Sequence, residues 1–143
     1  MVKPSEKESL VDSQYWLTPP ELYKQLNDEF PFDCDPCPYP YQGYDGCSID
    51  WGNVNYVNPP FRRKDAHHDA GPTMFTRKAI EEQQKGKTSV LILPVQGYVN
   101  LLFAAGAECR PLGRVKWLEA NTGKPTKTPS NNALFILRGT PQR

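Results

Sequence analysis

The run TSVLILPV, from Thr88 to Val95, constrains the fold more than any other stretch of the sequence. Its centre is apolar at every position, so a strand formed here has no face that can be left to water. Strands buried on both faces are typical of the parallel sheets of α/β proteins, in which helices cover both sides. The rest of the chain must therefore supply helices as well as further strands.

Helical patterns are found at three places. The stretch LTPPELYKQLNDEF, 17–30, predicts a helix with Thr18 as N-cap, Pro19 at the first helical position and Glu21 closing a capping box. Apolar residues at helical spacing predict a second helix over TMFTRKAIEEQQKGK, 73–87, and a third is expected around VNLLFAAG, 99–106.

Strands are expected between these helices and at the end of the chain. They are FPFDCD (30–35), NVNYV (53–57), the buried run, GRVKWLE (113–119) and NALFILRG (132–139). The turn-rich ANTGKPTKTPSN between the last two suits an antiparallel hairpin. The order predicts an α/β fold, with a mostly parallel sheet, helices on its faces and a C-terminal antiparallel hairpin.

The length of 143 residues suits one domain, which we place at 14–143 behind a flexible N-terminal segment, 1–13. No apolar run approaches the roughly 18 residues that cross a bilayer, and the N-terminal segment does not resemble a secretory signal. We therefore expect a soluble, cytoplasmic protein without a membrane partner.

Charge is distributed unevenly along the chain. Residues 1–60 hold 3 Lys+Arg against 10 Asp+Glu, a net of −7, and residues 61–143 hold 14 against 6, a net of +8. One interpretation is an acidic face for a neutral or cationic ligand and a basic face for a polyanion. The alternative is that the two parts neutralise each other within the fold.

The four cysteines are Cys34, Cys37, Cys47 and Cys109. A zinc site of Cys34, Cys37 and Cys47 with His67 or His68 has irregular ligand spacing, so we expect no metal. We expect free thiols that behave as small buried side chains.

The segment NVNYVNPPFRRK, 53–64, carries the clearest chemical signal. Pro59 and Pro60 fix their own φ angles and push Asn58 out of the helical region, which predicts a stiff turn rich in hydrogen-bond acceptors. Two acceptors on the hydrogens of a ring-bound amino group would localise its nitrogen lone pair, and Phe61 could stack on the ring. This arrangement suits methyl transfer to an amino nitrogen, although a proline-stiffened loop explains the same four residues without any chemistry.

Taken in order, four segments resemble the phage-type DNA N6-adenine methyltransferases, a family that uses S-adenosylmethionine. They are YWLTPPELYKQL, FDCDPCP, YDGCSIDWGNVNYVNPPF, and GRVKWL with PSNNALFIL, and together they span Tyr15 to Leu137. The resemblance implies a Rossmann-like methyltransferase fold that must be shortened, because few residues separate Asp35 from Asn58. Cys37 and Pro38 stand where many methyltransferases have a glycine-rich turn.

The resemblance also implies a role for each matching residue. Asn58, Pro59, Pro60 and Phe61 would form the catalytic loop, with Asn58 and the Pro59 carbonyl on the adenine N6 amino group. Thr18 and Pro19 would lie against the methionine part of S-adenosylmethionine, Asp35 would take its ammonium or a water beside it, and Asp50 with Trp51 would meet the ribose or adenine end.

Each cofactor assignment has a structural alternative. Thr18 is already explained as a helix cap, Asp35 before a proline suits a turn, and Trp51 suits the core.

DNA is the expected partner, and a homodimer would enlarge the contact area. Arg62, Arg63 and Lys64 follow the catalytic loop and are placed to hold phosphates, unless they are solvated loop charges. Other enzymes with this loop methylate an RNA base or a protein amide nitrogen, and a non-catalytic nucleic-acid-binding module is a further alternative. If the chain is phage-encoded, the compartment is the cytoplasm of a bacterial host.

Overall fold

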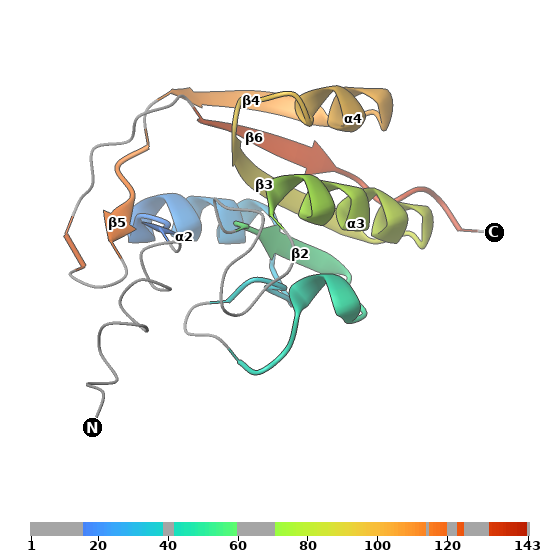
Figure 1. Cartoon of the computed structure of the whole chain (residues 1–143), viewed down its shortest axis with the longest axis horizontal. Coiled ribbons are helices and arrows are strands. Elements are labelled where there is room, and N and C mark those ends of the chain that lie inside the picture. The colour runs from blue at the N-terminus through green and yellow to red at the C-terminus, as the bar shows by residue number, and fades with distance from the viewer. Residues whose placement is uncertain are drawn as a thin grey trace.

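The computed structural model describes residues 16–38, 42–59, 71–113, 115–119, 123–124 and 132–142. These residues form an α/β fold around a four-stranded sheet (Figure 1). The sheet has the order β2-β3-β6-β4, with β2 at Val54–Val57, β3 at Thr88–Pro94, β6 at Asn132–Leu137 and β4 at Glu108–Gly113. The other elements are β1 (Trp16–Leu17), α2 (Pro20–Glu29), η1 (Gly46–Ser48), α3 (Pro72–Gln84), α4 (Val99–Ala104) and β5 (Leu118–Glu119).

The sheet is mixed, so the prediction of a mostly parallel sheet was wrong. β2 pairs in parallel with β3, whereas β6 pairs antiparallel with both β3 and β4. The predicted C-terminal hairpin is realised only in part: β6 pairs antiparallel with β4, which includes only Gly113 of the predicted partner strand 113–119. Most of the segment expected to pair with β6 lies elsewhere: Leu118 pairs with Leu17 of β1 in a separate two-stranded sheet.

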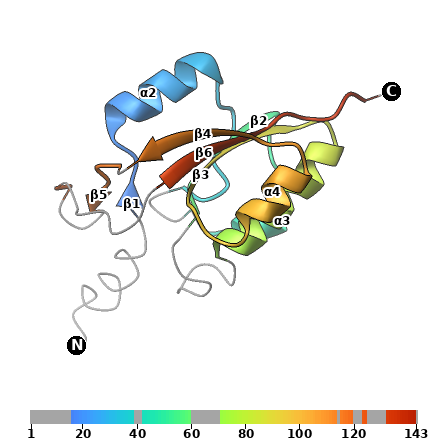
Figure 2. The ribbon, with the colours of Figure 1, turned by 90° about the horizontal axis from the view of Figure 1, so that it is seen from above.

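Helices cover both faces of the four-stranded sheet. Figure 2 shows α2 on one face and α3 with α4 on the other. Val90 and Ile92 of β3 pack on the α2 face, while Leu91 and Leu93 pack on the opposite face. The prediction that this strand is buried on both sides is confirmed, and its burial explains why the chain needs helices on two sides.

Two predicted elements differ from the structure, one helix at its start and one strand over most of its length. The N-cap of α2 is Pro19 and its first helical residue is Pro20, so Thr18 does not cap the helix. No side-chain cap bond is present at this helix end, and the predicted capping box was therefore wrong. The predicted strand at 30–35 is reduced to one parallel bridge, between Cys34 and Asn55.

The connection leading into β2 is held by three residues of the YDGCSIDWG segment. The Asp45 carboxylate accepts the Cys47 backbone N–H at 3.0 Å and so caps η1. A Cβ on Gly46 would lie 1.8 Å from the Pro36 carbonyl oxygen, so only glycine fits there. The Trp51 indole donates to the Gly46 carbonyl at 2.7 Å. This part of the motif therefore has a structural explanation of its own.

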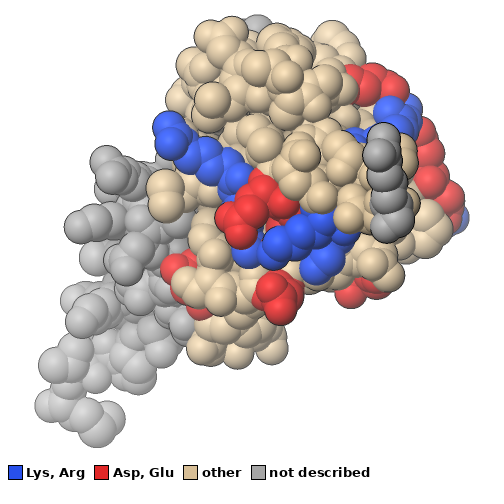
Figure 3. Space-filling model, turned by 90° about the vertical axis from the view of Figure 1, so that its right-hand side faces the viewer, with Lys and Arg blue, Asp and Glu red and all other residues tan. Residues whose placement is uncertain are grey.

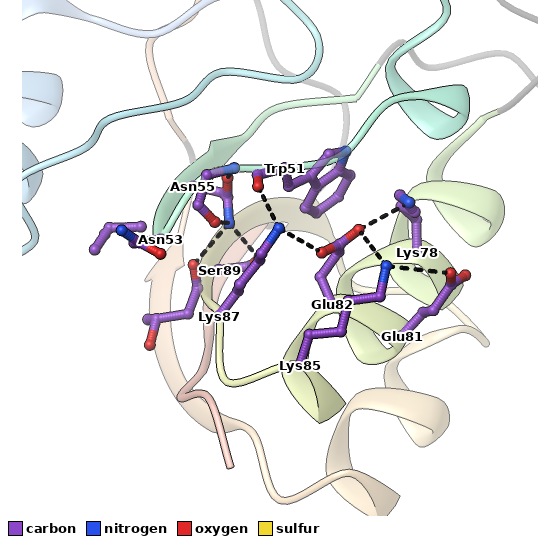
Figure 4. A network of polar contacts seen from close by, with 12 residues as sticks. Trp51, Asn53, Asn55, Lys78, Glu81, Glu82, Lys85, Lys87 and Ser89 are labelled. Atoms are coloured by element: carbon purple, nitrogen blue, oxygen red, sulfur yellow. Dashed lines mark hydrogen bonds and ion pairs between the residues drawn. The ribbon is translucent and has the colours of Figure 1, made fainter. Parts of the chain in front are cut away.

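A buried carboxylate fixes α3 to the start of the parallel strands (Figure 4). The Glu82 side chain is fully buried, and its carboxylate oxygens lie 2.8 Å from Lys78, 3.4 Å from Lys85 and 3.2 Å from Lys87. The Lys87 contact is an ion pair without hydrogen-bond geometry. Lys87 also donates to the Trp51 carbonyl at 2.6 Å, so the network reaches the segment before β2.

Glu82→Gln is expected to destabilise the fold by about 3 kcal/mol at neutral pH, because three lysines lose their buried partner. Burial raises the pKa of the Glu82 carboxyl, but the interactions with the Lys78 and Lys87 ammonium groups outweigh burial and hold this pKa below the usual 4.5. The stabilisation is thus present above pH 4.5 and is lost as the pH falls through the lowered pKa. Urea unfolding should show the difference from wild type shrinking in acid.

The matched control is Glu81→Gln, since Glu81 is 62% exposed and lies 3.9 Å from Lys85. It should cost less than about 0.5 kcal/mol at any pH. Equal effects of the two substitutions would contradict the role given to Glu82.

Candidate functional site

The candidate site lies where β2 and its neighbouring chain segment end. Asn58 and Pro59 follow β2 directly, and Asp35 follows Cys34, which is bridged in parallel to Asn55. The Tyr56 N–H donates to the Cys34 carbonyl at 3.0 Å. Because parallel segments end at the same edge of a sheet, Asp35 and Asn58 lie at one edge, where open α/β sheets bind their ligands.

Asp33 holds the Cys34 segment to the start of β2. Its carboxylate accepts the backbone N–H groups of Val54 at 2.9 Å and Asn53 at 3.2 Å, while its own N–H donates to the Val54 carbonyl at 3.0 Å. A Cβ on Gly52 would lie 2.4 Å from the Asp33 carboxylate, so the close approach requires glycine. Asp33 thus fixes the register that places Asp35.

Tyr56 joins the segment that contains Thr18 to this edge. Its side chain is 3% exposed, and its hydroxyl is hydrogen-bonded to the Thr18 hydroxyl. The Tyr56 ring packs edge-on against Tyr23, with 5.1 Å between ring centroids, and lies 5.2 Å from Phe32. Tyr56 thus bonds Thr18 through its side chain and the residue before Asp35 through its backbone, and Asn58 follows it by two residues.

Sequence reasoning missed Tyr56 and Tyr23. The available signal was position. Side chains alternate between the two faces of a strand, so Tyr56 lies on the face opposite to that of Val57, two residues before Asn58.

Asp35 forms its own turn in place of a glycine-rich one. Its Oδ1 accepts the Cys37 N–H at 3.0 Å, and its backbone carbonyl accepts the Tyr44 hydroxyl at 3.4 Å. Burial raises the pKa of the Asp35 carboxyl to about 6, against the opposing effect of the Cys37 hydrogen bond. Burial and, after it, the Asp35 charge raise the pKa of Tyr23 on α2. A cationic group placed here would relieve the unfavourable burial of the carboxylate.

Two predicted cofactor residues lie at the other end of β2. Asp50 and Trp51 precede the strand, whereas Asn58 follows it, and four residues of strand separate the ends by about 13 Å. Asp50 is exposed, and Trp51 is 3% exposed with its ring stacked on Phe75 at 6.4 Å. The structure therefore gives Trp51 the core position that the sequence left open, and it does not bring either residue beside Asp35.

Several predicted residues lie outside the described part of the chain. They are Pro60, Phe61, Arg62, Arg63 and Lys64, together with His67, His68 and the N-terminal segment 1–13. Pro19 is described and precedes α2 as its N-cap.

A hollow of about 390 Å³ lies at the start of α3, where the chain returns from residues 60–70. The described residues of its wall are Gly71, Pro72, Thr73, Met74 and Arg77. The helix after a parallel strand begins at the carboxyl edge of the sheet, so this hollow lies at the same edge as Asn58, on the face covered by α3.

Most cations of the described basic part are paired with acids. Arg110 forms a two-pronged contact with Glu29, at 2.7 and 2.8 Å, and so links the basic and acidic parts of the sequence. Figure 3 shows one side of the molecule, on which Lys and Arg lie next to Asp and Glu. Among the described residues, the cations of residues 61–143 pair mainly with acids of the same part, and Arg110–Glu29 is the ion pair that joins the two parts.

The cysteines are free thiols, of which Cys37 is buried and Cys109 is exposed. The expectation of small buried thiols therefore holds for Cys37 and not for Cys109. No cluster of three or more His, Cys, Asp or Glu side chains suited to a metal occurs among the residues that the structure describes. None of the described helices has the length and hydrophobicity of a membrane span.

Comparison of the sequence with protein-family models and with curated proteins finds no match. A function for the protein must therefore be inferred from the sequence resemblance and from the geometry of the carboxyl edge.

Asp35→Asn should make stability less dependent on pH. The folded protein keeps the Asp35 proton up to about pH 6, above the usual 3.8, so wild-type stability falls as the pH rises between these values and is constant above them. The asparagine variant lacks this loss while keeping an oxygen for the Cys37 N–H. Relative to wild type it should gain up to about 3 kcal/mol between pH 4 and pH 7 in urea unfolding.

Asp45→Asn is the control, because Asp45 also caps a turn through its side chain. A relative stability of Asp35→Asn that stays constant with pH would contradict the effect of burial on Asp35.

Proposed function

We propose that the protein transfers a methyl group from S-adenosylmethionine to the N6 amino group of adenine in DNA, on a shortened Rossmann-like methyltransferase fold. The observation that carries the proposal is that Tyr56, two residues before Asn58, bonds two distant segments, through its hydroxyl to Thr18 and through its backbone to the residue before Asp35. The family resemblance gives these three positions to cofactor and target binding. Their meeting at one sheet edge is what such an enzyme needs.

The proposed chemistry uses the acceptors that follow β2. The Asn58 side-chain oxygen and the Pro59 carbonyl accept the two hydrogens of the adenine amino group, which localises the nitrogen lone pair. S-Adenosylmethionine held beside Asp35 would supply the methyl carbon as the electrophile for this nitrogen. The methylated amino nitrogen would then release one proton to solvent. Phe61 stacks on the target ring.

The described residues fit the methionine end of S-adenosylmethionine, which supplies an electrophilic methyl group when bound. Asp35 offers a partly buried carboxylate for the ammonium, and the Thr18 hydroxyl lies close by through its bond to Tyr56. Pro19 adds apolar surface beside Thr18. Asp50 and Trp51 meet the ribose or adenine end in this proposal only if the cofactor extends to the start of β2.

DNA is the substrate class that the charges favour. Arg62, Arg63 and Lys64 follow the proposed catalytic loop. Arg77 lines the hollow at the start of α3, at the same carboxyl edge of the sheet. The lysines at the opposite end are occupied by Glu82. Cations free to meet phosphates are therefore proposed near Asn58, with the protein acting in the cytoplasm.

Asn58→Ala should reduce methyl transfer to DNA adenine by at least a hundredfold, because the substitution removes an acceptor that acts on the reacting amino group. The dissociation constant for S-adenosylmethionine should change by no more than a few fold. Nucleoside mass spectrometry after digestion of the DNA measures the first quantity, and calorimetry measures the second.

Asn53→Ala is the matched control, since Asn53 is exposed at the opposite end of β2. It should keep wild-type turnover. Wild-type turnover by Asn58→Ala would remove Asn58 from the mechanism.

Replacing Arg62, Arg63 and Lys64 together by alanine should weaken binding to all DNA sequences about equally, because phosphate contacts carry no sequence information. The plot of log K against log salt should flatten by about 0.7 to 0.9 for each phosphate that the variant no longer binds. The control replaces Lys85 and Arg138, which pair with acids, and should keep the wild-type slope. An unchanged slope in the triple variant would make its three cations solvated loop charges.

A further inference from the structure

A buried hydrogen-bond donor without a partner lies near the candidate site. Trp117 is 1% exposed, and its indole N–H has no acceptor. The described residues contain three other buried side-chain atoms without a hydrogen bond, namely Thr76 Oγ1, Glu82 Oε2 and Gln83 Oε1, all of them on α3. An indole N–H can only donate, so Trp117 can be satisfied only by an acceptor that enters from outside.

The antiparallel pairing of β1 with β5 sets the position of this donor. Leu17 pairs with Leu118. Thr18 follows Leu17 and Trp117 precedes Leu118, so the two residues flank the same end of this paired segment. Trp117 also belongs to the buried cluster that contains Tyr56, whose hydroxyl is bonded to Thr18.

The Thr18–Tyr56 contact leaves one further donor in this region. Each hydroxyl carries a single hydrogen, and only one of the two hydrogens can lie between the two oxygens. Whichever residue donates, the other keeps an O–H that can donate onward. Thr18, Tyr56 and Trp117 therefore provide two hydrogens for an acceptor.

Asp35 provides the opposite chemistry beside these donors. Its segment is bonded to the Tyr56 backbone, and its charge acts on both Tyr23 and Tyr56. The region thus combines two donors with one partly buried carboxylate. An α-amino acid head group, with a carboxylate and an ammonium on one carbon, is complementary to this set.

We propose that the indole N–H of Trp117 and the free hydroxyl hydrogen of the Thr18–Tyr56 pair bind the α-carboxylate of the cofactor's amino acid end, while Asp35 accepts from its ammonium. The inference rests on the proposed function and adds Trp117 and Tyr56 to the cofactor site. It makes the site selective for a nucleoside that carries an intact amino acid head group.

Calorimetry with two ligands tests the proposal. S-Adenosylhomocysteine has the complete head group, and 5′-deoxy-5′-(3-aminopropylthio)adenosine keeps the amine but lacks the carboxylate. Wild type should bind the first at least tenfold more tightly. Trp117→Phe and Tyr56→Phe retain an aromatic ring. Each should raise the dissociation constant of S-adenosylhomocysteine at least fivefold and change that of the second ligand by less than twofold.

NMR of the unmodified protein provides a second measurement that does not depend on folding of a variant. The indole N–H signal of Trp117 should move downfield on addition of S-adenosylhomocysteine. That of Trp51, already bonded to the Gly46 carbonyl, should stay in place.

The outcomes separate this inference from the proposed function. Tight binding of both ligands, with Trp117→Phe unchanged, would overturn the head-group site and leave the methyltransferase proposal standing. Equal weakening of both ligands in the variants would show a merely structural role for the two rings. Failure of wild type to bind S-adenosylhomocysteine would overturn both proposals.

Discussion

The parallel contact between the Cys34 segment and β2 is the interaction on which the candidate site depends. It consists of one bridge, Cys34 to Asn55, reinforced by the Asp33 carboxylate on the N–H groups of Asn53 and Val54. Because this contact sets the register, Asp35 lies at the edge of the sheet where Asn58 and Pro59 follow β2. A shift of one residue would turn the side chain of Asp35 to the other face of the sheet.

The two ends of β2 lie in different polar environments. At its start, Glu82, Lys87 and the Trp51 carbonyl fix the strand to α3 through buried charges. At its end lies a carboxyl with a raised pKa, and an indole N–H without an acceptor lies in the cluster that contains Tyr56. The Glu82 charge is paired with lysines within the fold, whereas a carboxyl whose pKa is raised by burial is typical of a functional site.

The sequence predicted most elements because their patterns are local. The apolar run at 88–95 and the helical spacing at 73–87 both gave strands and helices close to those observed. The strand order could not be predicted in this way, since β6 is apolar from Ala133 to Leu137 and this pattern does not specify which strands lie beside it. The capping role of Thr18 failed because the hydroxyl bonds to Tyr56, 38 residues away.

The candidate site was predictable only in part for a related reason. Asp35 and Asn58 were found because each follows a predicted strand, and strand ends meet in a parallel arrangement. Tyr56 and Trp117 look like ordinary core residues in the sequence. A hydrogen bond joins Tyr56 to Thr18, and the pairing of β1 with β5 brings the Trp117 segment to the same region. Trp51 shows the converse, since the motif that contains it is explained by its bond to the Gly46 carbonyl.

The proposed methylation of adenine in DNA is tested most directly with an isotopic label. The protein is incubated with S-adenosylmethionine carrying a deuterated methyl group and a mixture of DNA, RNA and protein extract, followed by mass spectrometry of nucleosides and peptides. We expect the deuterated label on N6 of deoxyadenosine. Label confined to an RNA base or to a protein amide nitrogen, or no label in any fraction, would contradict the proposed activity.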